Sequence, residues 1–215
     1  MARISKDPLI RQAELIEQAQ KLFFAKGYQA TTIQDIVAAV GVSHGTFYYH
    51  FNSKEALLED LIVQQIERLI KKEEAKKTEH MDPLIHLNAI VRLFYQICYE
   101  GNVAHLTDIL YAEKQGELIN RIWRQANYLI EPVLKPILEE CNAKKITKVD
   151  SMPETLWFLG GIIATLLETT TAEGYAHEKD RTRLSVKREM AARLIERLLG
   201  VPEKTIDLQL AEDIF

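Results

Sequence analysis

Apolar residues recur three and four positions apart along most of this chain, and the alternation typical of β-strands is nearly absent. Between residues 8 and 26 the apolar positions are Ile10, Ala13, Leu15, Ile16, Ala19, Leu22 and Phe23. Asp7 followed by Pro8 is typical of a helix start, and Gly27 is typical of a helix end. The pattern therefore predicts a helix over these residues.

Two short helices are predicted next. The segment "TTIQDIVAAVGV" begins with Thr31 and Gln34 at the spacing of a capping box, and Gly41 ends it after little more than two turns. Ser43 is a suitable N-cap for the following segment, "HGTFYYH". Two short helices joined by a turn of three or four residues form a helix-turn-helix, whose second helix enters the DNA major groove.

The second short helix has two different faces. Phe47 and Phe51 lie four residues apart, so they share one face and are predicted to be buried. Roughly opposite lies Gly45, which costs about 1 kcal/mol of helix propensity and suits a place where another backbone approaches closely. The exposed side chains that can donate to phosphates or base edges are Ser43, Thr46, Tyr48, Tyr49 and His50. The alternative is that these polar side chains simply cover the surface of a small domain.

The rest of the chain is also predicted to be helical. Asn52 or Ser53 caps a long helix that runs to about Lys77. Asp82 and Gly101 bound a further helix, and Pro132 and Pro136 are expected to kink or split a later one. We therefore expect an all-α protein with a helix-turn-helix domain over residues 1–54, a connecting helix over about 53–77, and a helical ligand-binding and dimerisation domain over 75–215.

The last two predicted helices, over residues 156–173 and 183–199, are apolar on more than one face. Either they lie in a deep core of one chain, or they form a four-helix bundle with a second copy. We expect the homodimer. The candidate interface residues are Gly160, Ile163, Leu167, Ala191, Leu194 and Leu198.

Charge and composition restrict the partners. The net charge of −4 excludes a polycation, so nucleic acid must be bound by a local patch. Residues 1–54 carry six Lys or Arg against four acids, which is a weak excess and favours a dimer that doubles the contacts. Cys98 and Cys141 lie in apolar patterns and are expected to be reduced thiols. With no signal-peptide pattern and no membrane span, we expect a cytoplasmic protein.

The segment "AQKLFFAKGYQATTIQDIVAAVGVSHGTFYYHFNSKEALL" carries a resemblance. Residues 10–58 resemble the DNA-binding domain of the TetR family of bacterial transcription regulators. The resemblance implies phosphate contacts from Thr32, Ser43, Thr46, Tyr49, His50 and Lys54, and groove contacts from His44, Gly45 and Tyr48. Thr31 completes the candidate DNA-binding set. Position 44 is often a long polar residue in the family, so His44 leaves the identity of the bases in doubt.

The resemblance also implies a small-molecule pocket in the second domain. The candidate ligand-binding residues are Phe94, Cys98, Tyr111, Glu113, Trp123, Asn127, Trp157 and Glu168. Core packing is the alternative for each of them. Glu113 and Glu168 hint at a cationic ligand, although either can equally face solvent or form a salt bridge.

No enzyme motif is present in the sequence. The histidines and cysteines lack the spacing of metal ligands, and there is no Gly-rich phosphate loop or nucleophile elbow. We expect no cofactor, metal or catalytic residue. The expected function is a homodimeric repressor that a small-molecule effector releases from double-stranded operator DNA, with the long helix after Ser53 as the only coupling element. A transcriptional activator of the same fold, or a ligand-binding helical protein without DNA recognition, remains an alternative.

Overall fold

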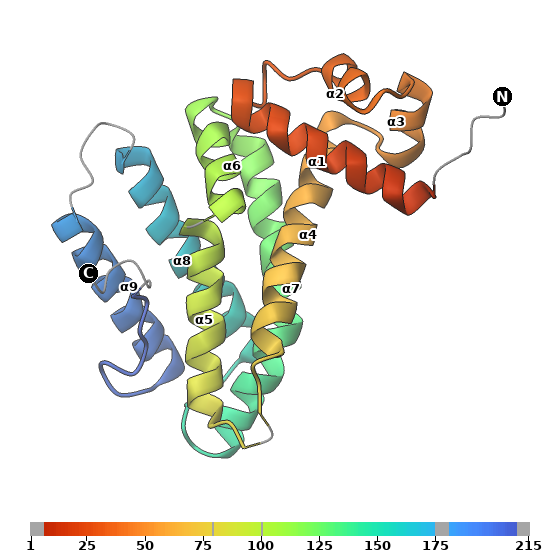
Figure 1. Cartoon of the computed structure of the whole chain (residues 1–215). Coiled ribbons are helices and arrows are strands. Elements are labelled where there is room, and N and C mark those ends of the chain that lie inside the picture. Colours follow the sequence, from red (N-terminus) through yellow and green to blue (C-terminus); the bar gives the residue numbers. More distant parts are fainter. Residues whose placement is uncertain (1–6, 79, 100, 175–180, 210–215) are drawn as a thin grey trace.

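The computed structural model describes residues 7–78, 80–99, 101–174 and 181–209, which form nine helices and no strand (Figure 1). The prediction of an all-α protein is confirmed. The helices are α1 Pro8–Lys26, α2 Ile33–Val40, α3 His44–His50, α4 Lys54–Glu74, α5 Pro83–Tyr99, α6 Gly101–Ala112, α7 Gly116–Ala143, α8 Met152–Gly174 and α9 Arg181–Leu199.

Local capping sets the bounds of the first helices. The Asp7 carboxylate accepts a hydrogen bond from the Leu9 amide at 2.8 Å, and α1 ends at Gly27 with a φ of 89°. The predicted cap of α2 is wrong by one residue, because Thr32 and Asp35, not Thr31 and Gln34, form the capping box. Thr31 cannot cap the helix because its hydroxyl donates to the carbonyl of Gly27 at 2.7 Å.

The small domain of α1, α2, α3 and the start of α4 packs around aromatic side chains. Phe47 is fully buried and Phe51 nearly so, as predicted, and their ring centroids lie 5.8 Å apart. Phe23 of α1 and Ile36 of α2 are fully buried in the same cluster. This packing fixes α3 against α1 and α2, so that its opposite face points outward.

The larger domain departs from the predicted pattern at Gly101, and it excludes one of the two outcomes expected at the prolines, the split. Gly101 begins α6, whereas we expected it only to end the preceding helix. Helix α7 runs unbroken through Pro132 and Pro136, so it is not split. Each proline removes one main-chain hydrogen bond. Buried side chains on both sides of the second proline, including Leu134 and Ile137, hold the helix in the core.

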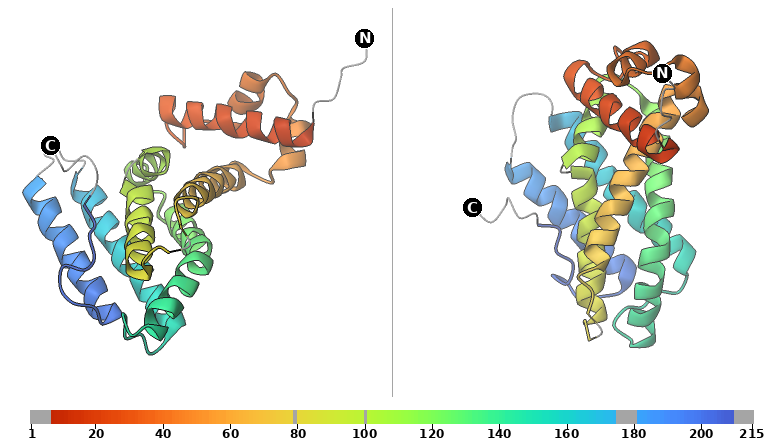
Figure 2. Two further views of the ribbon diagram at one scale, coloured as in Figure 1. Left: turned by 60° about the horizontal axis from the view of Figure 1, so that its bottom comes forward. Right: turned by 45° about the vertical axis from the view of Figure 1, so that its right-hand side comes forward.

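Helices α8 and α9 pack side by side along one edge of the molecule, with the small domain at the opposite end (Figures 1 and 2). Among the described helices, α9 has extensive contacts only with α8. The segment after α9 provides a second attachment. The Asn88 amide on α5 donates to the Thr205 carbonyl and accepts from the Asp207 amide at 3.0 Å, while the buried Glu196 carboxylate accepts from the Ile206 amide at 2.9 Å.

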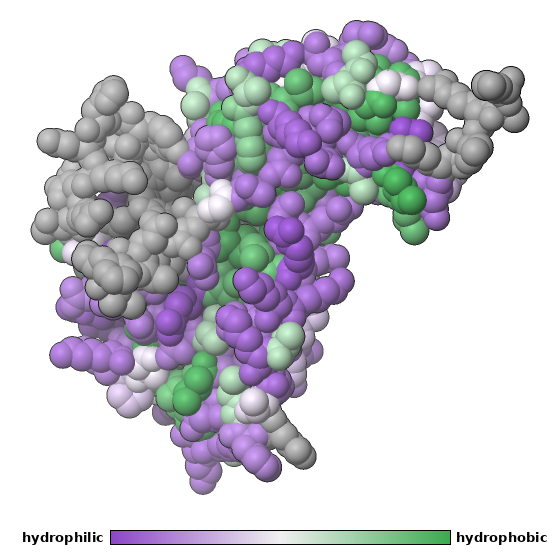
Figure 3. All heavy atoms as spheres, in the orientation of Figure 1, coloured by the Kyte–Doolittle hydropathy of each residue, from purple (hydrophilic) through white to green (hydrophobic). Residues whose placement is uncertain are grey.

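The small domain overhangs the larger one, and polar residues cover most of the described surface on the face in Figure 3. No helix in the described ranges is long and apolar enough to cross a membrane. Cys141 is buried and free, and burial raises the pKa of its thiol to about 11. The side chain of Cys98 lies outside the described residues.

Candidate nucleic-acid interface and sensor region

The outer face of α3 is polar and aromatic. Tyr48 is 54% exposed and Tyr49 is 75% exposed, although both are large side chains that burial would stabilise. His44 and Ser43 are exposed beside them. Their neighbour Phe47 is fully buried, so the helix separates an inner face that folds the domain from an outer face that is available to a partner.

Gly45 lies in the middle of this outer face. A Cβ atom at this position would meet only the Ser43 hydroxyl oxygen, at an ordinary contact distance of 3.6 Å. The fold therefore does not require a glycine here. A close approach from outside the chain is the remaining structural reason for the missing side chain.

Two of the predicted DNA-contacting hydroxyls, those of Thr32 and Ser43, also cap helices. The Thr46 amide donates to the Ser43 hydroxyl oxygen at 3.2 Å, and the two hydroxyl oxygens lie 3.1 Å apart. Thr32 donates its hydroxyl to Asp35 at 2.7 Å. His50 is half-buried and stacks edge-on against Tyr49 at 4.9 Å. Burial, with the nearby Arg11 charge, lowers the pKa of His50, which favours its neutral form.

Thr31 does not belong to the exposed set. Its side chain is fully buried, so it cannot contact DNA in this conformation. Sequence alone places it beside Thr32, and only the packing of the turn after α1 separates the two residues.

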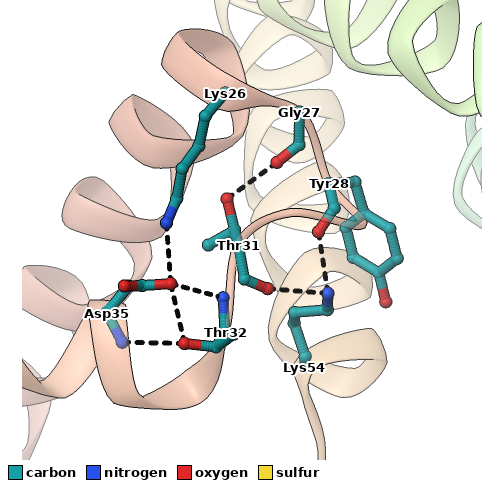
Figure 4. A network of polar contacts seen from close by, with 7 residues as sticks. All are labelled: Lys26, Gly27, Tyr28, Thr31, Thr32, Asp35 and Lys54. Carbon is teal, nitrogen blue, oxygen red and sulfur yellow. Dashed lines mark hydrogen bonds and ion pairs between the residues drawn. The ribbon is translucent and has the colours of Figure 1, made fainter.

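Lys54 is committed to the protein itself (Figure 4). Its ammonium donates to the carbonyls of Tyr28 at 2.7 Å and Thr31 at 2.8 Å, and lies 4.1 Å from the centroid of the Tyr28 ring. Burial lowers the pKa of Lys54, in opposition to the nearby Glu55 and Glu113 carboxylates. The lysine therefore fastens the α1–α2 turn to the start of α4.

The other described cations of the small domain are paired as well. Arg11 pairs with Glu14, Lys21 with Glu17, and Lys26 with Asp35, all at 2.7 Å or less. These partly exposed pairs contribute little to stability and can rearrange. The exposed donors of α3 that carry no charge, by contrast, are free of such ion pairs.

The predicted ligand residues do not form one site. Phe94 lies in the core, Asn127 is half-buried beside Gly160, and Trp157 is 58% exposed on α8. Tyr111 and Trp123 do come together, in an open cleft of about 440 Å³ between the α6–α7 turn and α8. Its other lining residues are Lys114, Gly116, Ile119, Asn120 and Ala164. The side chain of Glu168 lies outside the described residues.

Sequence reasoning missed Lys114 and Asn120 as lining residues. The only signal for Lys114 is a short polar turn, "KQG", between two helices that each carry an aromatic residue, and the sequence holds no such signal for Asn120. A second cavity, of only about 10 Å³, lies behind the cleft and shares Ile119 and Trp123 with it. Its remaining lining is Ile66, Val103, Thr107, Ile122 and Ala126.

Glu113 contacts the small domain instead of the cleft. Its carboxylate accepts from the Gln29 amide at 2.8 Å, and its carbonyl accepts from the Gln29 side chain at 3.1 Å. Phe24 of α1 and His105 of α6 also meet edge to face at 4.6 Å. The prediction that α4 alone joins the two domains is therefore wrong, because the end of α6 holds the α1–α2 turn directly.

The predicted dimer residues divide into two groups. Gly160, Ile163 and Ala191 are buried within their own chain, so they cannot face a second copy. Leu194 is 45% exposed and Leu198 is half-buried. The side chain of Leu167 lies outside the described residues.

Of the apolar residues that the structure describes as exposed on α8 and α9, only Leu194 belongs to the predicted set. We define the α8–α9 patch as Trp157, Phe158, Val186, Met190 and Leu194, each at least 45% exposed. The three residues from α9 lie four apart, so they form one stripe along the helix. The exposed stripe and the buried stripe beside it have the same helical spacing of apolar residues, so the spacing alone could not show which of them is buried.

Known proteins resemble the chain in both sequence and fold. Residues 15–61 match the family described as "Bacterial regulatory proteins, tetR family". The HTH-type transcriptional repressor KstR2 of Rhodococcus jostii is 28% identical over 109 residues, which cover 51% of this chain and 52% of KstR2. The uncharacterized HTH-type regulator YerO of Bacillus subtilis is 50% identical over 48 residues, which cover 22% of this chain and 17% of YerO. The chain thus matches about half the length, or less, of these curated relatives.

The likeness to solved structures extends over most of the chain. RolR in complex with resorcinol superposes with a TM-score of 0.69 over 91% of this chain and 90% of RolR, at 16% identity. At that identity the likeness shows the fold alone.

Proposed function

Because this chain belongs, through residues 15–61, to the TetR family of bacterial regulatory proteins, we propose that it represses transcription as a DNA-binding homodimer. The observation that carries the proposal is the outer face of α3. Two large aromatic side chains with hydroxyl groups stay exposed there, around a glycine that the fold does not need. Such a face fits a major groove, in which hydroxyl groups and rings meet base edges and phosphates.

The residues of the face have different roles in this proposal. Gly45 lets the DNA backbone approach, and Tyr48 and His44 reach the groove. Ser43, Thr46, Tyr49, His50 and Thr32 contact phosphates. Phosphate contacts position the protein without reading sequence, whereas base contacts supply the specificity.

Dimerisation compensates for the weak charge of one small domain. Since its described cations are paired, a single domain would bind DNA weakly, and two domains on one duplex double the contacts. The α8–α9 patch supplies an apolar surface for the second copy. The two α3 helices would then meet half-sites about one helical turn apart, roughly 34–36 Å centre to centre, or somewhat wider.

A small molecule in the larger domain is proposed to release the DNA. The fold of RolR, which is known with resorcinol bound, supports a small-molecule effector in this architecture. The contact of Glu113 with Gln29 offers a path from that domain to the α1–α2 turn. A coupling of about 1–3 kcal/mol would weaken operator binding by roughly 5- to 150-fold.

Footprinting of the purified protein on genomic DNA, followed by binding assays on the protected site, tests the proposal. Gly45→Val is expected to abolish binding while helix content and mass stay normal, because the fold leaves room for the added atoms. Ala143→Val, at the exposed end of α7 far from α3, is the matched control. Normal operator binding by Gly45→Val would overturn the placement of α3, and a chain that protects no DNA would overturn the proposed function.

A further inference from the structure

We propose that the cleft between the α6–α7 turn and α8 is the effector site and that it takes a planar aromatic anion, such as an aromatic carboxylate. The inference rests on the proposed function for its regulatory meaning. The proposed chemical class of the ligand rests on the residues of the cleft alone. It reverses the sign of the ligand charge that the acidic residues suggested from sequence.

The shape and lining of the cleft favour a flat ring. About 440 Å³ is open to a ligand between Tyr111 and Trp123 on one side and Ala164 of α8 on the other. Both aromatic residues are only half-buried, so their surfaces remain available for stacking. The small side chain of Ala164 leaves room opposite them.

Lys114 gives this wall of the cleft a positive charge. Among the lining residues that the structure describes, it is the only charged one. Its ammonium has no ion pair or hydrogen bond within the described ranges of the chain, unlike the paired lysines Lys21, Lys26 and Lys144. The acid beside it, Glu113, is turned toward Gln29. Lys114 can therefore form an ion pair with an anionic ligand at this wall of the cleft.

Neutral donors point to the same ligand class. The Asn120 side chain lines the cleft next to the first residue of α7, Gly116. Gln115, at the N-cap of this long helix, makes no side-chain capping hydrogen bond, and its side-chain nitrogen donates to the Glu113 carbonyl at 3.1 Å. The first amides of α7 therefore add positive potential to the side of the cleft where Lys114 lies.

The apolar end of the ligand has a place to extend. Ile119 and Trp123 separate the cleft from the small apolar cavity among α4, α6 and α7. That cavity now has room for about 10 Å³, no more than a water molecule. Because Ile119 and Trp123 line both spaces, the proposed ligand carries two fused rings, the second of which packs against this apolar wall.

The cleft lies one residue from the contact between the domains. Lys114 has a φ of 58°, a left-handed conformation that costs energy for a residue other than glycine. Main-chain bonds from Lys114 to Tyr111 at 3.0 Å and from Gln115 to Leu110 at 2.9 Å hold the turn together. Because the turn moves as a unit, a ligand that draws Lys114 into the cleft also draws Glu113 away from Gln29.

Three naphthalene compounds of similar size test the ligand class by calorimetry on the full chain: 2-naphthoate, 2-naphthamide and 2-naphthylmethylammonium. We expect naphthoate to bind about tenfold or more tighter than the amide, because a charged hydrogen bond to Lys114 is gained. Lys114→Gln should remove that difference and leave the affinity for the amide unchanged. Lys135→Gln, an exposed lysine elsewhere on α7, is the matched control and should keep it.

Each contrary outcome has a definite meaning. The proposal is overturned if naphthoate does not bind, or if the amide or the ammonium compound binds as tightly as naphthoate. It is also overturned if Lys114→Gln still binds naphthoate more tightly than the amide. Hydrogen exchange of the Gln29 amide provides the second measurement. It should become faster with naphthoate and should already be fast in Glu113→Ala. DNA binding by the ligand-free protein is measured separately, so failure of this site is distinguishable from failure of the proposed function.

Discussion

Replacing Lys54 by methionine keeps the aliphatic stem of the side chain and removes only its ammonium. The carbonyls of Tyr28 and Thr31 then lose their charged donor, and the Tyr28 ring loses the cation over its face. The turn after α1 would no longer be fastened to α4. We expect the variant to fold, with a small domain that opens more often.

The size of the effect follows from these contacts. A hydrogen bond to a charged group contributes about 1.5–3 kcal/mol, and water replaces part of it at a half-buried site. We therefore expect a loss of about 2–3 kcal/mol in the local stability of the turn. Amides protected by this turn should exchange about 30- to 150-fold faster.

Hydrogen exchange of the Thr31 amide, which donates to the Tyr28 carbonyl at 3.3 Å, is a direct readout. Lys71→Met is the control, since Lys71 is an exposed lysine on the same helix. The family resemblance instead implied a phosphate contact for Lys54. Two results together would refute the structural role of Lys54 and support the phosphate contact. The exchange rate of the Thr31 amide in Lys54→Met would be unchanged, and the slope of log affinity for DNA against log salt concentration would be smaller by about 0.9 for each lost contact.

Three further predictions concern stability and assembly. Hydrogen bonds from Lys26 and Thr32 hold the pKa of Asp35 well below its ordinary value. The contribution of Asp35 to stability is therefore complete above about pH 3.9, the pKa of the unfolded chain, and is lost as the pH falls further. In an acid titration followed by circular dichroism, the wild type should unfold more steeply than Asp35→Asn. Phe47→Ala should destabilise the small domain by about 3–5 kcal/mol in urea melts, and an unchanged midpoint would contradict the placement of this ring in the core. Met190→Glu should give a folded monomer in sedimentation, whereas a persistent dimer would show that the α8–α9 patch is not the interface.

Local chemistry explains why most helix ends could be predicted from sequence. Asp7, Gly27, Gly41 and Ser43 each satisfy main-chain groups within a few residues, so the signal and its effect lie in the same segment. The choice between two adjacent threonines at the start of α2 is different. Both have a suitable partner three residues later, and only the burial of Thr31 by other elements decides between them.

Long-range contacts account for what could not be predicted. Glu113 and Gln29 are 84 residues apart, and no spacing rule joins them. Ile163 and Met190 both belong to apolar helical patterns, yet one is buried by its own chain and the other is exposed. A pattern shows that a side chain avoids water, but it does not show which surface covers it.

The attachment of α9 by the segment around Ile206 has a consequence for the order of events during synthesis. Helix α9 can pack on α8 once both helices are outside the ribosome, but its link to α5 through Asn88 forms only after Thr205, Ile206 and Asp207 have emerged. By contrast, the buried apolar residues of α1, α2, α3 and the turns beside them lie between Leu15 and Phe51, so this part of the chain emerges and can fold early. A nascent chain can therefore carry a folded small domain before the link that fastens α9, and with it part of the surface proposed for pairing, is complete.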